Sequence, residues 1–208
     1  MPKLIVVGAG GCGREVMQWA IDWGTLFTPY GFIDDNPNAL SGLFANHPIL
    51  GSISRWQPAE DELFVCGIAD PKTKRKVVAD LKARGARFIS LVHPTALVSA
   101  TAQIGEGVVI CPHATISDNA KVNDYVYINL YTAIGHDAIV GAYSTLSSFT
   151  DITGGVVIGE EVFSGSHVSV VPKVQIGAGA YLCAGSVVMS RVAKDTKVLG
   201  NPARRFAL

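Results

Sequence analysis

An excess of charge of either sign is missing from this sequence. Its 17 Lys and Arg residues balance 17 Asp and Glu residues, so the formal net charge is zero. No cluster of basic residues alternates with aromatic residues, which removes the electrostatic case for binding nucleic acid. We therefore expect no nucleic-acid partner.

Long apolar runs and paired cysteines are missing as well. The N-terminus reads Met-Pro-Lys-Leu-Ile-Val-Val and reaches glycine after four apolar residues, too few for a signal sequence or a membrane span. The cysteines, Cys12, Cys66, Cys111 and Cys183, are scattered without a CxxC pair, which favours reduced thiols over a disulfide or zinc framework. These absences predict a cytoplasmic protein with no membrane segment and no metal site.

What the sequence does contain, from Val92 to about Ala193, is a period of six residues. An aliphatic residue recurs at the first position of each hexad, interrupted only by Ser164, and a small or β-branched residue recurs at the fifth. The first positions are Val92, Val98, Ile104, Ile110, Ile116, Val122, Ile128, Ile134, Val140, Leu146, Ile152, Ile158, Ser164, Val170, Ile176, Leu182 and Val188. The fifth positions run from Ala96 to Val192.

A period of six fits neither a helix nor a plain strand, so the chain must turn within each unit and return its aliphatic side chain to one axis. Such self-similarity is typical of a hexapeptide β-helix, in which three hexads close one coil and residues eighteen apart stack. Seventeen hexads predict nearly six coils. Because the register is never lost, no long external loop is inserted. A ligand pocket must therefore come from the N-terminal region or from a neighbouring subunit.

The first residues predict a strand, a glycine turn and a helix. Lys3 to Val7 is apolar, Gly8 to Gly13 satisfies G-x-G-x-x-G, and Arg14 to Trp23 has helical spacing. Glycines there let backbone N–H groups and a helix N-terminus approach a phosphate. A second strand, Pro29 to Ile33, ends at Asp34-Asp35, where a carboxylate would hold a ribose hydroxyl. The alternative is a tight strand-to-helix turn that binds no ligand.

The segment before the coils predicts two more strands and a helix. The strands are Leu63 to Ile68 and Phe88 to Leu91; the helix is Pro71 to Arg84, with Lys72, Lys74, Arg75 and Lys76 facing water. We therefore predict an α/β, half-Rossmann-like domain over residues 1–91 and an all-β parallel β-helix with a C-terminal tail over residues 92–208. Half of a dinucleotide fold suits a mononucleotide or a nucleotide sugar better than NAD.

Three histidines lie in the hexads. His136 is at a third position and is followed by Asp137, the arrangement that a general base and its orienting carboxylate require. His113 and His167 are at fourth positions, for which we expect surface or inter-subunit hydrogen bonds. A zinc lyase is an alternative, but the separations of 23 and 31 residues are not multiples of eighteen, so the three rings would not stack on one corner.

Several motifs occur together along the whole chain. They are Gly8-Ala9-Gly10-Gly11, Phe32-Ile33-Asp34-Asp35-Asn36, the hexads, Gly135-His136-Asp137 and Gly200-Asn201-Pro202-Ala203-Arg204. In this order they resemble the sialic-acid O-acetyltransferase and UDP-amino-sugar N-acetyltransferase family of bacterial surface-glycan pathways. The resemblance implies a left-handed β-helix and a homotrimer with the acetyl-CoA arm between adjacent β-helices. It also implies a nucleotide sugar bound by the N-terminal domain.

The same resemblance implies roles for individual residues. His136 is implied as the base, Asp137 as its orienting acid and Gly154 as the donor of an N–H to the thioester oxygen. Residues implied to bind acetyl-CoA are Gly154, Ser166, Ala184, Gly185 and Arg204. Residues implied to bind the nucleotide sugar are Gly8, Gly10, Gly11, Cys12, Asp34 and Asp35. Family members often carry histidine where this chain has Cys12, so an imidazole contact is lost there.

The expected activity is transfer of acetyl from acetyl-CoA to an amino or hydroxyl group of a nucleotide-linked sugar, in a pathway such as lipopolysaccharide biosynthesis. Two alternatives stay open from the sequence. One is a non-catalytic β-helix protein that binds a nucleotide sugar, and the other is an acetyltransferase for a free sugar such as sialic acid.

Overall fold

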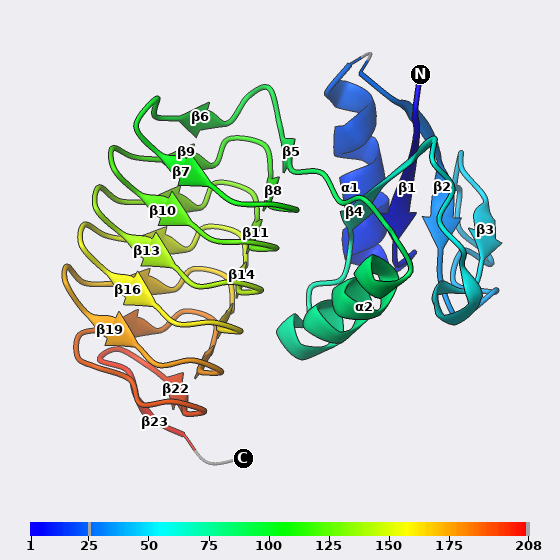
Figure 1. Cartoon of the computed structure of the whole chain (residues 1–208). Helices are drawn as coiled ribbons and strands as arrows, with labels where there is room; N and C mark the ends of the chain where they lie inside the picture. Colours follow the sequence, from blue (N-terminus) through cyan, green and yellow to red (C-terminus); the bar gives the residue numbers. More distant parts are fainter. Residues whose placement is uncertain (25, 207–208) are drawn as a thin grey trace.

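The computed structural model describes residues 1–24 and 26–206. A small α/β layer comes first, and a prism of short parallel strands follows, with β22 and β23 at the far end of the prism (Figure 1). None of the helices described in these two ranges is long and apolar enough to cross a membrane.

The N-terminal layer is a four-stranded parallel sheet in the order β3-β2-β1-β4. Residues from Leu4 to Val7 are fully buried, because one helix covers each face of the sheet. Helix α1 packs on the face of Leu4 and Val6, and α2 on the face of Ile5 and Val7. The elements are β1 (Lys3–Val7), α1 (Gly11–Asp22), β2 (Thr28–Ile33), β3 (Ile49–Gly51), the 3-10 turn η1 (Ile53–Arg55), β4 (Glu62–Cys66) and α2 (Pro71–Ala83).

Two expectations for this layer need correction, and one strand was not expected. Helix α1 begins at Gly11, earlier than its apolar spacing indicates. Strand β3 was not expected, because three residues are too few for a periodic signal. The strand expected over Phe88 to Leu91 is wrong: Phe88 makes a single bridge to Phe64, and the chain then leaves for the prism.

The prism confirms the hexad register without a slip. Seventeen two-residue strands, β5 to β21, start every six residues and form three sheets, with the tail strands β22 and β23 closing one of them. The first sheet holds β5 (Leu91–Val92), β8 (Val109–Ile110), β11 (Tyr127–Ile128), β14 (Thr145–Leu146), β17 (Phe163–Ser164), β20 (Tyr181–Leu182), β22 (Lys197–Leu199) and β23 (Arg204–Arg205). The second holds β6 (Leu97–Val98), β9 (Thr115–Ile116), β12 (Ala133–Ile134), β15 (Asp151–Ile152), β18 (Ser169–Val170) and β21 (Val187–Val188). The third holds β7 (Gln103–Ile104), β10 (Lys121–Val122), β13 (Ile139–Val140), β16 (Val157–Ile158) and β19 (Gln175–Ile176).

The core of the prism is built from the first and fifth positions of the hexads. Every first position from Ile110 to Val188 is at most 3% exposed. Residues eighteen apart pair directly, as Ile134 does with Ile152. The exception, Ser164, is tolerated because its hydroxyl pairs with Thr150 Oγ1 at 3.1 Å and donates to a backbone carbonyl.

Corners form where the fourth position of each hexad turns the chain. From Gly107 to Gly185 every fourth position has a positive φ, between 55° and 71°. Side chains in this left-handed region cost about 1 kcal/mol each, yet His113, Tyr131 and Asp137 occupy it. The repeated corner explains how a two-residue strand can turn and return to the same axis.

The α/β layer docks on the outside of the first sheet. Trp19 of α1 lies against Tyr127, and Tyr125 joins the core under α2. The expectation that the basic residues of α2 all face water is wrong for Lys74, which is 2% exposed. Arg75 stays partly exposed and pairs with Glu160 and Glu161 of the prism.

Candidate active site

His136 lies on a corner of the prism between β12 and β13. Its Nδ1 lies 2.8 Å from Asp137 Oδ2, and both side chains are largely exposed, 71% and 61%. Asp137 occupies the left-handed fourth position, so its carboxylate is beside the ring of the preceding residue. This contact occupies Nδ1 and leaves Nε2 for a second partner.

Gly154 lies under the ring of His136, one coil further along the same corner. A β-carbon at Gly154 would lie 2.5 Å from His136 Nε2. Within the described residues, the Gly154 N–H donates to no backbone or side-chain acceptor. Gly135 makes room for this N–H, because a β-carbon there would lie 2.6 Å from the Gly154 nitrogen. The sequence motif includes Gly135, but the sequence reasoning gave it no role in the site.

The other two histidines lie on a different corner. His113 stacks on Tyr131, Tyr131 on Phe149, and Phe149 on His167, with ring centroids 4.9, 5.1 and 4.8 Å apart. The two histidines thus belong to an aromatic stack of residues eighteen apart, and the expected surface or inter-subunit hydrogen bonds stay a prediction. Across residues 1–24 and 26–206, no three His, Cys, Asp or Glu side chains gather in a way that could hold a metal ion.

The residues expected to hold the pantetheine arm share the corner of that aromatic stack. Ser166 and Gly185 are joined by a 2.9 Å hydrogen bond from the Gly185 N–H to the Ser166 carbonyl, and Ala184 is exposed next to them. We call residues 165–168 and 183–186 the Ser166 corner; they follow strands of the first sheet. Residues 135–138 and 153–156, the His136 corner, follow strands of the second sheet, so the two corners are different. One chain therefore does not bring His136 and Gly154 together with Ser166, Ala184 and Gly185.

Arg204 lies on β23 at the end of the prism. It lines a hollow of about 290 Å³ together with Arg191 and Arg205. Three arginine residues lining one hollow suit a phosphate-bearing ligand. The other two arginines were missed, because only Arg204 falls in the C-terminal motif.

The glycine turn leads directly into α1. Gly8 has φ +93°, and Gly13 packs so closely that a β-carbon there would lie 1.9 Å from the Gly8 carbonyl oxygen. Gly10 caps the helix without a side-chain hydrogen bond, and the first turn, which includes Gly11, holds no acidic residue. The first N–H groups of α1 are therefore uncapped by side chains, as an anion site requires.

Cys12 faces the prism and lines none of the hollows beside the turn. Burial raises the pKa of its thiol to about 11. The thiols of Cys12 and Cys111 flank the buried phenol of Tyr127. Burial also raises the thiol pKa values of Cys66 and Cys111, so these three thiols are poorly suited to nucleophilic chemistry.

The two acidic residues after β2 differ in whether a carboxylate oxygen is free to bind a ligand. Asp34 is used at both oxygens, accepting from the Ala9 N–H at 2.7 Å and the Asn36 N–H at 2.8 Å. Asp35 accepts at Oδ1 from Ser52 and Ser54, which lowers the pKa of its carboxyl, and its Oδ2 accepts nothing from the described residues. Both line a hollow of about 440 Å³. Asp35 is thus the carboxylate with a free oxygen for a ligand.

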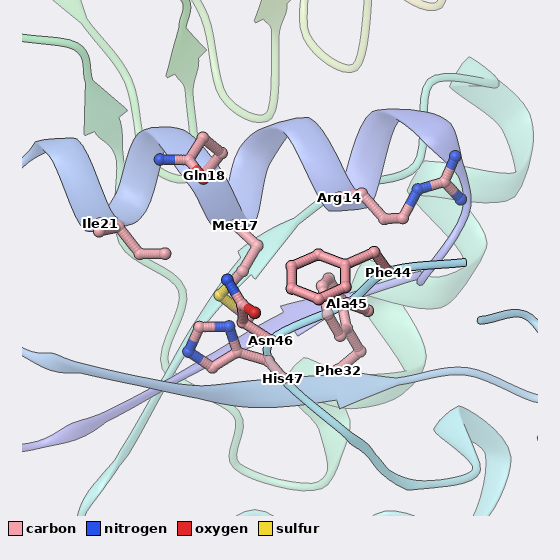
Figure 2. A pocket seen from close by; sticks show the side chains of 9 residues that line it. All are labelled: Arg14, Met17, Gln18, Ile21, Phe32, Phe44, Ala45, Asn46 and His47. Carbon is pink, nitrogen blue, oxygen red and sulfur yellow. The ribbon is translucent and has the colours of Figure 1, made fainter. Parts of the chain in front are cut away.

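A second hollow, of about 290 Å³, lies beside α1 (Figure 2). Arg14, Met17, Gln18 and Ile21 of α1 form one wall, and residues 44–47 form another. Sequence reasoning missed it, because residues 44–47 belong to no predicted element.

Comparisons with known proteins agree with this arrangement. Residues 3–81 match the family model of the PglD N-terminal domain. No curated protein matches the sequence. Among solved structures, the acetyltransferase domain of PglB from Neisseria gonorrhoeae is 27% identical, with a TM-score of 0.92 over 99% of this chain and 100% of that one. The same domain has been solved in complex with acetyl coenzyme A.

Two further solved structures are similar over nearly the whole chain. WeeI from Acinetobacter baumannii is 28% identical, with a TM-score of 0.88 over 98% of this chain and 99% of that one. Perosamine N-acetyltransferase from Caulobacter crescentus, solved with CoA and GDP-perosamine, has a TM-score of 0.92 over 100% and 98% of the two chains; at 24% identity it informs the fold only. The expected left-handed β-helix and the resemblance to the UDP-amino-sugar N-acetyltransferase family are confirmed.

Proposed function

We propose that this chain is an acetyl-CoA-dependent N-acetyltransferase of the UDP-amino-sugar N-acetyltransferase family, acting on an amino sugar linked to a nucleotide. The observation that carries the proposal is the position of His136. Its Nδ1 is held by Asp137, and its Nε2 lies against Gly154, whose N–H donates to no acceptor among residues 1–24 and 26–206. A base next to an oxyanion donor is what acyl transfer to an amine requires.

The reaction is direct transfer. His136 Nε2 accepts a proton from the acceptor amine while the nitrogen attacks the carbonyl carbon of the thioester. The Gly154 N–H stabilises the oxyanion, the carbon–sulfur bond then breaks, and the proton on His136 returns to the departing CoA thiolate. The products are the acetamido sugar and CoA. General-base catalysis contributes about 10²–10⁴-fold and one oxyanion donor about 10²–10³-fold.

The two substrates bind to different parts of the chain. Acetyl-CoA, the substrate with which the gonococcal domain was solved, is held by Ser166, Ala184 and Gly185, with its phosphates near Arg204. The nucleotide of the acceptor is held by the uncapped turn at Gly8, Gly10 and Gly11 and by Asp35. We do not assign Cys12 or Asp34 a direct contact, because the Cys12 thiol packs against the prism and both carboxylate oxygens of Asp34 accept backbone N–H groups.

The active enzyme is a homotrimer. This is supported by the separation of the His136 corner from the Ser166 corner within one chain, since a neighbouring copy can bring the two corners together. We expect light scattering to give three subunits. Co-assembly of His136→Ala with Ala184→Trp subunits should restore activity that neither variant has alone, because some interfaces then combine two intact corners. If the mixed assemblies stay inactive, each active site lies within one chain.

The experiment that tests the activity is a thiol-release screen. Purified protein is mixed with acetyl-CoA and nucleotide-linked amino sugars, and free CoA is measured with a thiol-reactive dye. We expect release with at least one acceptor and none with free sialic acid. Release with the free sugar alone would favour a free-sugar acetyltransferase, and no release with any acceptor would favour a binding protein. Because acetyl-CoA is made and used in the cytoplasm, we expect the reaction there, in a surface-glycan pathway such as that of lipopolysaccharide.

A further inference from the structure

A lysine is buried where the α/β layer meets the prism. Lys74 of α2 is 2% exposed, and its ammonium group donates to the Ser144 carbonyl at 3.1 Å and to Thr145 Oγ1 at 2.9 Å. No carboxylate in the described ranges lies within ion-pair distance of its Nζ. Burial lowers the pKa of Lys74 to about 8, so the group is still mainly charged at neutral pH.

A charge buried in this way costs stability. A methionine of similar length would fill the same space without desolvating an ammonium group. Methionine could not make the two hydrogen bonds by which Lys74 fixes α2 to one point on one coil. The residue therefore suits a role in orientation better than a role in stability.

The coil to which Lys74 donates its hydrogen bonds is the one that carries His136. From His136 the chain passes through β13 to Ser144 and Thr145, without leaving that coil. Thr145 also reaches the α/β layer itself, since its hydroxyl donates to the Ala69 carbonyl at 2.6 Å. Ser144 and Thr145 are fully buried, so the junction is dry and its hydrogen bonds are not exchanged for water.

Within the α/β layer, the residues that precede α2 contact the glycine turn. Residues 67–69 follow β4 and precede α2, and they pack on the turn. A β-carbon at Gly8 would lie 3.0 Å from Ile68 Cγ1, and one at Gly67 would lie 2.5 Å from the Gly13 α-carbon. A short chain of contacts thus links the turn, Ala69, Thr145 and the coil of His136.

We propose that Lys74 is a positioning residue that, with Thr145, sets the α/β layer at one orientation on the coil that carries His136. The proposal rests on the proposed function, in which the layer holds the acceptor. Lys74 touches neither substrate. Losing its hydrogen bonds would let the layer shift, which misplaces the acceptor amine but not the acetyl-CoA bound by the prism.

The test is Lys74→Met in the full chain. We expect the acceptor KM to rise about tenfold or more, because small misplacements of a substrate are costly, while the acetyl-CoA KM stays within about twofold. Melting temperature should be equal or higher. Thr145→Val should also raise the acceptor KM. Thr145→Ser should keep the wild-type KM values, since serine retains the hydroxyl. Lys76→Met, an exposed lysine on the same helix, is the matched control.

Hydrogen exchange makes the proposal testable without turnover. In Lys74→Met, amides of α2 and β14 should exchange faster, while those of β18 and β21 should be unchanged. Unchanged exchange at α2 and β14, or both KM values unchanged, would overturn the positioning role. A wild-type enzyme with no turnover would overturn the proposed function instead, and the exchange comparison would still decide the role of Lys74.

Discussion

The imidazole of His136 rests on Gly154, close enough that a β-carbon on Gly154 would lie 2.5 Å from Nε2. Gly154→Ala should therefore displace the ring and lower kcat at least about tenfold, with little loss of stability. Steady-state rates and thermal melting measure the two effects. Gly155→Ala is the control: its φ of +68° predicts a loss of about 1 kcal/mol in the free energy of unfolding with kcat nearly kept. The reverse pattern would show that Gly154 has no role beside the base.

His136→Ala should lower kcat at least about a hundredfold with little change in either KM, because a base acts in the transition state. Asp137→Asn should lower it less, since the amide can still bond Nδ1 but lacks the charge that favours imidazolium. His113→Ala is the control, since its ring stacks on Tyr131 on the other corner, three coils before the residues proposed to hold acetyl-CoA. Loss of activity in the control, with His136→Ala active, would move the site to that corner.

Asp35→Ala should raise the acceptor KM and leave the acetyl-CoA KM nearly unchanged, because it removes the carboxylate oxygen left free in the hollow after β2. Ser54→Ala, which removes one hydroxyl donor to Asp35 but not the carboxylate, should have a smaller effect. Initial rates at varied concentrations of each substrate give both constants. Weaker acetyl-CoA binding in Asp35→Ala would mean that the substrates have been assigned to the wrong parts of the chain.

Ile152→Asp should be severely destabilising, because it buries an unpaired carboxylate against Ile134 in the dry prism. Ile152→Val should cost about 1 kcal/mol. Thermal melting of the two variants is the measurement. Similar small shifts for both would contradict the eighteen-residue register.

The register of the prism can be read from the sequence because every hexad repeats the same pattern of side chains. One aliphatic residue must return to the axis every six positions, so Ile134 and Ile152 could be paired without coordinates. The same register places Gly154 one coil from His136. The glycine turn and Asp35 were predictable because their backbone geometry depends on near neighbours in the chain.

Contacts between distant segments were decided only by the tertiary structure. Lys74 sits in a run of basic residues that predicts a solvated face, and only the docking of α2 on the prism buries it. The same docking turns Cys12 toward Tyr127. Hydrophobic spacing reports which side of an element is buried, but not which distant surface buries it, because that depends on how whole layers pack.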